Sequence, residues 1–179
     1  MPTVLKLANE VRYVTATATV CGARPNMKYL VFQMDLEVGN PEENRKIIER
    51  WLEANYCDDL DVVVLPEMWS TGYALEGLKE ICKVDGNQSI EFLQSLGKRF
   101  NVNLVGGSIA VLDGKDIFNR AVIVNGMGEI VHIYDKMHLV PMLDEPKFLT
   151  GGHNQVKVFE LEGVEMGIII CYDLRFTIP

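Results

Sequence analysis

The sequence predicts an α/β fold, and three observations support that prediction. Residues 61–65 form a continuous apolar run, as expected of a strand in a sheet that is covered on both faces. A capped helical pattern begins at Asn40, earlier in the chain. Further along, Asn125-Gly126 and Gly128 mark a tight hairpin turn between two apolar strands. Helices therefore come early in this chain and hairpins come later.

The domain is expected to open at Met27 with a buried strand, a turn and a helix in close succession. Asn40 can cap that helix, and Pro41 suits its first position. Glu42 and Glu43 follow in the first turn, where carboxylates favour the positive end of the helix. The side chains expected on its inner face are Ile47, Ile48, Trp51 and Leu52.

The rest of the chain continues the alternation of helices and strands. After the strand at 61–65, a second helical pattern runs over residues 89–100. Its inward side chains are expected to be Leu93, Leu96 and Phe100. Further strands are expected over residues 103–111, 119–124, 129–134, 155–161 and 164–170. The last two should pair around Glu162-Gly163 and lead directly to Cys171.

Composition and charge exclude several classes of function. The 179 residues suffice for one domain with a substantial core, and nearly half of them are apolar. A formal charge of −8 without any basic run argues against nucleic-acid binding, which needs clustered Lys and Arg. Because no apolar stretch reaches the roughly 18 to 20 residues of a membrane span, no membrane partner is expected. A compact signal-peptide core is also missing, so we expect a cytoplasmic protein.

The four cysteines are Cys21, Cys57, Cys82 and Cys171. They are scattered along the chain without the CxxC spacing of a zinc site or a disulfide framework. We therefore expect four free thiols.

The first 26 residues differ in kind from the remainder. They carry the alternating run VTATATV and then CGARPN, and no motif used elsewhere in the chain. We interpret residues 1–26 as an extension outside the domain, with Met27 as the natural first residue, and residues 27–179 as the domain. The alternative is an extra edge strand over residues 13–20, which the alternation supports.

Three reactive side chains follow predicted strands. Glu67 comes after VVVLP, Lys136 lies in YDKMHL, and Cys171 comes after MGIII. A cysteine thiol is mostly protonated at neutral pH, so it needs a base before it can attack a carbonyl carbon. A carboxylate can accept that proton, and an ammonium can stabilise the resulting charges. Taken singly, each has a simpler interpretation as a core cysteine, a solvated carboxylate or an exposed lysine.

The sequence motifs around these residues closely resemble those of the nitrilase, or carbon-nitrogen hydrolase, superfamily. They are VLPEMWSTGY, YDKMHLVPMLDEP and GIIICYDLRF. The resemblance implies an αββα sandwich. It also implies that Glu67 is the general base and Cys171 the nucleophile. Lys136 would stand beside the oxyanion of the tetrahedral intermediate, helped by the backbone N–H of Tyr172.

A second glutamate is implied as well. Glu145, in VPMLDEPKF, resembles the glutamate that holds the lysine in many members of the family. Its neighbour Asp144 could instead be the residue that points inward, and either could be an ordinary turn residue. The resemblance gives Asp173 and Arg175 structural polar contacts rather than catalytic roles.

The implied activity is hydrolysis of a non-peptide C–N bond through a thioester, without any metal or organic cofactor. HLVPMLDEPKFLTGG followed by ICYDLRF is most similar to the omega-amidase branch, which acts on 2-oxoglutaramate and 2-oxosuccinamate. The partner would then be a small-molecule amide, and homo-oligomers are common in the family. Other branches act on nitriles, aliphatic amides or N-carbamoyl amino acids.

The sequence departs from the family pattern at its end, eight residues after Cys171. Thr177, Ile178 and Pro179 stand where the family has proline and glutamate. We therefore expect residues 27–179 to form the N-terminal part of a carbon-nitrogen hydrolase domain, incomplete at its C-terminus. A catalytically silent fragment or an interaction module of the same fold is the alternative. A flavodoxin-type binding domain is disfavoured, because no glycine-rich loop follows the first strand.

Overall fold

The computed structural model describes residues 13–16, 27–153 and 156–176, with the backbone alone described for 13–16. Its main feature is a six-stranded sheet in which the strands lie side by side in chain order. The strands are β1 (Tyr13–Ala16), β2 (Met27–Val31), β3 (Val62–Val64), β4 (Asn103–Asp113), β5 (Asp116–Val124) and β6 (Ile130–Asp135). The inner strands β2, β3 and β4 are parallel, and the other neighbours are antiparallel.

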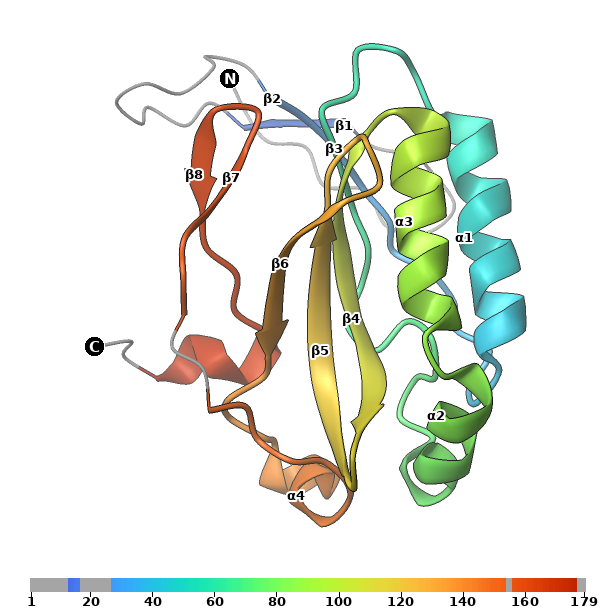
Figure 1. Ribbon diagram of the computed structural model, residues 1–179, viewed down its shortest axis with the longest axis vertical. Coiled ribbons are helices and arrows are strands. Elements are labelled where there is room, and N and C mark those ends of the chain that lie inside the picture. Colours follow the sequence, from blue (N-terminus) through green and yellow to red (C-terminus); the bar gives the residue numbers. More distant parts are fainter. Residues whose placement is uncertain (1–12, 17–26, 154–155, 177–179) are drawn as a thin grey trace.

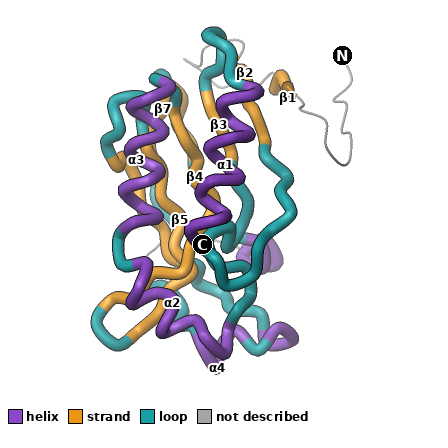
Figure 2. Tube along the Cα trace, turned by 90° about the vertical axis from the view of Figure 1, so that its right-hand side faces the viewer, coloured by secondary structure: helices purple, strands orange, loops and turns teal. Residues whose placement is uncertain are grey.

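Helices cover one face of this sheet. Figure 2 shows α1 (Pro41–Asn55) and α3 (Gln88–Phe100) side by side in front of the strands, with α2 (Leu78–Asp85) below them. The start of α1 confirms the predicted cap, because the side chain of Asn40 accepts a hydrogen bond from the backbone N–H of Glu43 at 3.1 Å. The helix predicted over 89–100 is also confirmed and begins one residue earlier, at Gln88.

The main core lies between these helices and the sheet. Its buried members include Leu30, Ile48, Leu52, Val63, Trp69, Leu93, Leu96, Leu104, Val122 and Val124. Most of the inward residues predicted for both helices contribute to it, although Trp51 and Phe100 are only partly buried and Ile47 is not part of this cluster. Trp51 stacks on Phe32, with ring centroids 4.0 Å apart. Residues of β3 and β4 belong to the same core, and the loop that follows β3 carries Glu67.

A two-stranded hairpin covers part of the other face of the sheet. It consists of β7 (Phe159–Leu161) and β8 (Val164–Met166), and Figure 1 shows it on the side opposite α1 and α3. Phe159 and Leu161 pack there against Tyr134. The described residues thus supply a helix layer, the main sheet and a second small sheet, as in the expected αββα arrangement.

The two hairpin strands are shorter than predicted. Pairing is limited to three residues on each side of the turn at Glu162 and Gly163. Residues 167–170 do not form a strand, and the predicted start at 155 lies outside the described residues. An apolar run becomes a strand only where a neighbouring strand pairs with its backbone, and residues 167–170 pair with no strand in the described part of the chain.

The edge strand considered for residues 13–20 is present over its first four residues. β1 pairs antiparallel with β2, with Tyr13 opposite Leu30. Residues 17–20 and most of the remaining extension lie outside the described residues. That residues 1–26 lie outside the domain therefore stays a prediction.

Short helical segments that the sequence did not predict gather at the lower end of the sheet. They are η2 (Pro141–Leu143), α4 (Glu145–Phe148) and η3 (Cys171–Arg175), besides α2 on the helix side. Figure 1 shows α4 below the ends of β5 and β6. Among the described residues, no helix combines the length and the apolar character that a membrane span requires.

Candidate active site

The loop after β3 carries Glu67 and is fixed by β4. Ser108 accepts a hydrogen bond from the backbone N–H of Met68 at 3.0 Å, and its own backbone N–H donates to the carbonyl of Pro66 at 3.2 Å. Gly107 has a φ of 58°, and a Cβ there would collide with that carbonyl oxygen. The β4 bulge between Val105 and Ser108 therefore holds the Glu67 loop against the sheet.

Lys136 is fully buried directly after β6, between two carboxylates. Its Nζ lies 2.8 Å from Oε1 of Glu67 and 2.9 Å from Oε1 of Glu145. The other oxygen of Glu145 accepts a hydrogen bond from the backbone N–H of Val140 at 2.6 Å. Strands β3 and β6 run in the same direction, so Glu67 and Lys136 leave the sheet at the same edge.

The charge of Lys136 is maintained by its partners. Burial alone would lower the pKa of Lys136, but hydrogen bonds and charge attraction from Glu67 and Glu145 outweigh it, so the pKa is raised. The site therefore contains a permanent cation.

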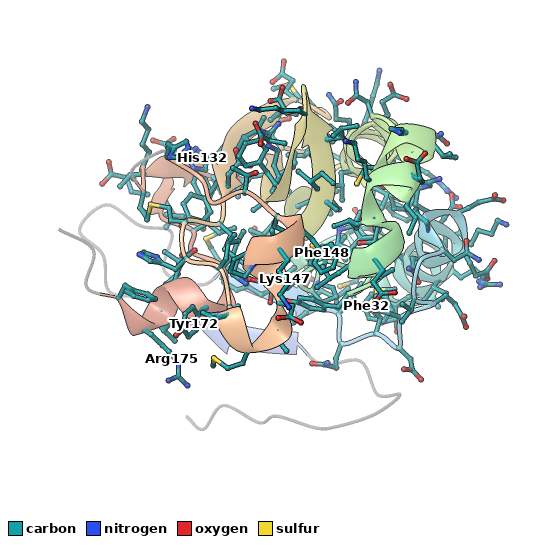
Figure 3. All side chains as sticks on the ribbon, turned by 90° about the horizontal axis from the view of Figure 1, so that it is seen from below. Phe32, His132, Lys147, Phe148, Tyr172 and Arg175 are labelled. Carbon is teal, nitrogen blue, oxygen red and sulfur yellow. The ribbon has the colours of Figure 1, made fainter. Side chains whose placement is uncertain are left out.

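The choice between Asp144 and Glu145 is resolved by their positions. Glu145 is fully buried against Lys136. Asp144 has a φ of 58° and points outward to an exposed ion pair with Lys147 at 2.9 Å. Figure 3 shows Lys147 and Phe148 on α4, which lies between η3 and the helices of the other face. Glu145 is thus the inward residue of the pair.

Cys171 begins η3 and is exposed. Its backbone φ is 47°, a value that residues other than glycine rarely adopt. This is the sharp turn expected of a nucleophile elbow, although residues 167–170, which lead into it, do not form the predicted strand. Partial burial raises the pKa of the Cys171 thiol, and the charge of Glu67 raises it further, whereas Lys136 lowers it. The thiol is therefore protonated near neutral pH and needs a base in order to react.

The buried carboxylate of Asp173 stabilises the turn at Cys171 through hydrogen bonds. Asp173 accepts hydrogen bonds from the Tyr134 hydroxyl at 2.7 Å and from the backbone N–H groups of His138 and Ile170 at 2.8 and 3.1 Å. The ring Nδ1 of His138 also lies 2.8 Å from it. The structural contacts expected of Asp173 are therefore confirmed. Through them the segment after Lys136 is joined to the segment that begins with Cys171.

Arg175 differs from Asp173, because it is exposed and lies over the ring of Tyr172, 5.7 Å from the ring centroid. Both side chains extend from η3 at the periphery of the molecule (Figure 3). The backbone N–H of Tyr172 lies in the first turn of η3, next to Cys171. Its oxyanion role stays a prediction.

Two further residues of the site were not predicted. Asn119 is fully buried on β5, and its Nδ2 donates to Oε1 of Glu67 at 3.0 Å. Burial raises the pKa of the Tyr73 phenol well above its usual range, and the nearby carboxylates of Glu67 and Glu145 raise it further. Tyr73 therefore stays protonated as a hydrogen-bond donor. The sequence feature that pointed to Tyr73 was its place in the motif LPEMWSTGY. The feature that pointed to Asn119 was a lone amide in an apolar strand.

The sequence pattern of one protein family, described as Carbon-nitrogen hydrolase, matches residues 17–177. The chain belongs to the carbon-nitrogen hydrolase family. A protein called "Hydrolase in agr operon" from Staphylococcus aureus is 43% identical over 153 residues. A 2-oxoglutaramate amidase from Bacillus subtilis is 38% identical over 152 residues. Each match covers 84% of this chain and 58% of the relative.

Solved structures agree with this assignment. Nit3 of Saccharomyces cerevisiae, from branch 10 of the nitrilase superfamily, superposes with a TM-score of 0.71 at 28% identity. That match covers 84% of this chain and 57% of Nit3. The carbon-nitrogen hydrolase XC1258 of Xanthomonas campestris gives a TM-score of 0.72 at 26% identity, covering 81% of this chain and 53% of XC1258. The predicted family and nitrilase-type fold are therefore confirmed, and the chain spans somewhat over half the length of these relatives.

Proposed function

We propose that this carbon-nitrogen hydrolase chain carries the site of a cysteine-dependent amidase. Its reaction is the release of ammonia from a small dicarboxylate monoamide such as 2-oxoglutaramate. The observation that carries the proposal is the buried ammonium of Lys136, held between Glu67 and Glu145 beside the thiol of Cys171.

The first half of the reaction forms a thioester. Glu67 takes the proton from Sγ of Cys171, and the sulfur attacks the amide carbon, so that a C–S bond forms and the carbonyl electrons move to oxygen. The ammonium of Lys136 and the backbone N–H of Tyr172 stabilise this oxyanion. When the intermediate collapses, the C–N bond breaks, and Glu67 returns its proton to the departing nitrogen. Ammonia leaves, and the acyl group stays on sulfur.

The second half repeats this chemistry with water. Glu67 removes a proton from a water molecule as that molecule attacks the thioester carbon. Collapse breaks the C–S bond, and the proton returns from Glu67 to the sulfur of Cys171. The products are the carboxylic acid and the free thiol, so the site is regenerated without a net change in its protons.

The choice of substrate is supported by the relatives. One is called 2-oxoglutaramate amidase, and another, from Escherichia coli, is an omega-amidase that is 31% identical over 154 residues. A dicarboxylate monoamide also needs a cation for its distal carboxylate. Lys136 does not provide it, because its charge is committed to Glu67 and Glu145. That cation is a separate requirement of the proposal.

The test is ammonia release from 2-oxoglutaramate by the 179-residue chain, compared with Cys171→Ala. We expect release by the parent chain and none above background by the variant. Cys57→Ala is the matched control, since Cys57 is also a free thiol but lies outside this site, and it should retain the parent rate.

Other outcomes identify the alternatives. Faster turnover of a nitrile, an aliphatic amide or an N-carbamoyl amino acid would contradict the omega-amidase assignment and leave the cysteine mechanism standing. Absence of turnover with every one of these substrates would favour the silent fragment or interaction module. The cytoplasmic location and the homo-oligomeric state stay predictions from the sequence.

A further inference from the structure

Asn119 connects both charged partners of the site. Its backbone carbonyl accepts a hydrogen bond from the backbone N–H of Lys136 at 2.9 Å. Its side-chain Nδ2 donates to Oε1 of Glu67 at 3.0 Å, and the side chain is fully buried. Oε1 of Glu67 thus receives two donors, the amide of Asn119 and the ammonium of Lys136. One residue of β5 therefore fixes the base and the segment that carries the cation.

The amide of Asn119 is held in one orientation at a cost. Its Oδ1 is buried and has no hydrogen-bond partner among the residues that the structure describes. A buried acceptor without a partner is unfavourable and rare in folded proteins. Turning the amide over would not improve the site, because it would place a carbonyl oxygen against the carboxylate of Glu67. The free energy gained from the hydrogen bond to Glu67 therefore exceeds the cost of leaving Oδ1 of Asn119 without a partner.

We infer that Asn119 is a positioning residue for the proposed reaction, which orients the carboxylate of Glu67. With Oε1 committed to two donors, Oε2 is the oxygen assigned to receive the proton of Cys171. This inference rests on the proposed function and adds a further residue to its site.

Asn103 shows what a purely structural asparagine looks like in the same sheet. It is also buried, at the start of β4, and both the nitrogen and the oxygen of its amide form hydrogen bonds. Its Nδ2 donates to the carbonyl of Asp61 and to Glu162, and its Oδ1 accepts from the backbone N–H of Gly126. Removing Asn103 should destabilise the fold without affecting Glu67, which makes Asn103→Leu the matched control.

The decisive variant is Asn119→Leu, which keeps a similar shape and removes both the donor and the unpaired acceptor. Replacing a polar group by an apolar one of the same shape can be nearly neutral for stability, so this variant should fold. The measurement is the ¹³C chemical shift of the Glu67 side-chain carboxyl carbon at neutral pH, by NMR on chain labelled at glutamate. The signal of Glu67 is the one lost in Glu67→Gln.

We expect the Glu67 signal to move in Asn119→Leu, because its carboxylate loses the donor to Oε1. Asn103→Leu should leave the Glu67 signal unchanged. Asn119→Asp serves if the leucine variant does not fold, and it should also move the signal, because it replaces the donor by an acceptor. An unchanged Glu67 signal in a folded Asn119 variant would overturn the inference.

The NMR measurement needs no turnover, so the two proposals fail in different ways. Absence of Cys171-dependent ammonia release in the parent chain would contradict the proposed function alone. A parent chain that turns over the amide, together with a Glu67 signal unmoved in Asn119→Leu, would contradict the role of Asn119 alone.

Discussion

The two halves of the candidate site are built differently. Lys136 is fully buried, and both of its carboxylate partners, Glu67 and Glu145, are held by strands or by backbone hydrogen bonds. Cys171 instead lies exposed at the start of a short 3₁₀ helix, in a strained backbone conformation. It is joined to the lysine side mainly through Asp173.

This difference indicates which part of the chemistry is fixed by the fold. The electrostatic half is preorganised, because its charges are paired inside a rigid sheet and a tight loop. The nucleophile depends on a few polar contacts beneath an exposed turn. Loss of the buried lysine should therefore affect stability most, whereas changes at the turn that carries Cys171, or in the charge near its thiol, should affect thiol reactivity.

The largest effect is expected from Lys136→Met. Removing this ammonium leaves the carboxylates of Glu67 and Glu145 close together without a counter-charge, which should cost about 3–5 kcal/mol in the free energy of unfolding. Urea denaturation at neutral pH measures it. Lys147→Met is the control, since its ion pair with Asp144 is exposed and should contribute little. Equal stability of the two variants would mean that the lysine half is not the rigid one.

A smaller loss is expected from Asp173→Ala. It removes a buried acceptor that is shared by Tyr134, His138 and Ile170, and should cost about 2–3 kcal/mol of unfolding free energy. Cys171 should then react faster with iodoacetamide, because the loosened turn relieves the partial burial that raises the pKa of its thiol.

Tyr134→Phe provides the graded control for this change. It removes only one of the hydrogen bonds to Asp173 and should cost about 1 kcal/mol of unfolding free energy. The elbow contacts would be shown to be unimportant if Asp173→Ala left both the stability and the alkylation rate of Cys171 unchanged.

The smallest change in stability, but an informative change in reactivity, is expected from Glu67→Gln. The negative charge of Glu67 contributes to the raised pKa of Cys171, so removing that charge should lower the pKa of the thiol. The alkylation rate of Cys171 should then rise at a lower pH than in the parent chain, while ammonia release is lost.

Two references calibrate this alkylation experiment. Burial raises the pKa of the Cys82 thiol to about 11, so Cys82 should stay unreactive at pH 8 in every variant. Glu76→Gln removes an exposed carboxylate outside the site and should leave the Cys171 profile unchanged. A Cys171 profile that moved to higher pH in Glu67→Gln would contradict the arrangement described for the thiol and the carboxylate.

Much of the fold could be predicted because its signals are local. Asn40 and Pro41 define the start of α1 within two residues, and Asn125 with Gly128 determines the turn between β5 and β6. The short segments η2, α4 and η3 could not be predicted in this way. Helices of so few residues have little intrinsic stability and exist because of the packing around them.

The candidate site shows the same difference between features that local sequence predicts and features that depend on packing. Glu67, Lys136 and Cys171 were predicted as site residues from the sequence motifs that surround them, and the structure brings Glu67 and Lys136 into contact. Asn119 was not predicted: a lone amide in an apolar strand indicates a buried polar contact, but the strand sequence does not tell which carboxylate that amide will meet across the sheet. The inward position of Glu145 rather than Asp144 likewise depends on the positive φ of Asp144, which the sequence does not encode locally.

The most direct test of the account is to trap the acyl intermediate. The 179-residue chain is mixed with 2-oxoglutaramate, quenched with acid within one turnover and analysed by mass spectrometry of its peptides. We predict an acyl adduct on the peptide that carries Cys171, formed together with one equivalent of ammonia and missing in Cys171→Ala. Ammonia release without an adduct, at a rate unchanged in Cys171→Ala, would contradict the central claim that this cysteine is the nucleophile.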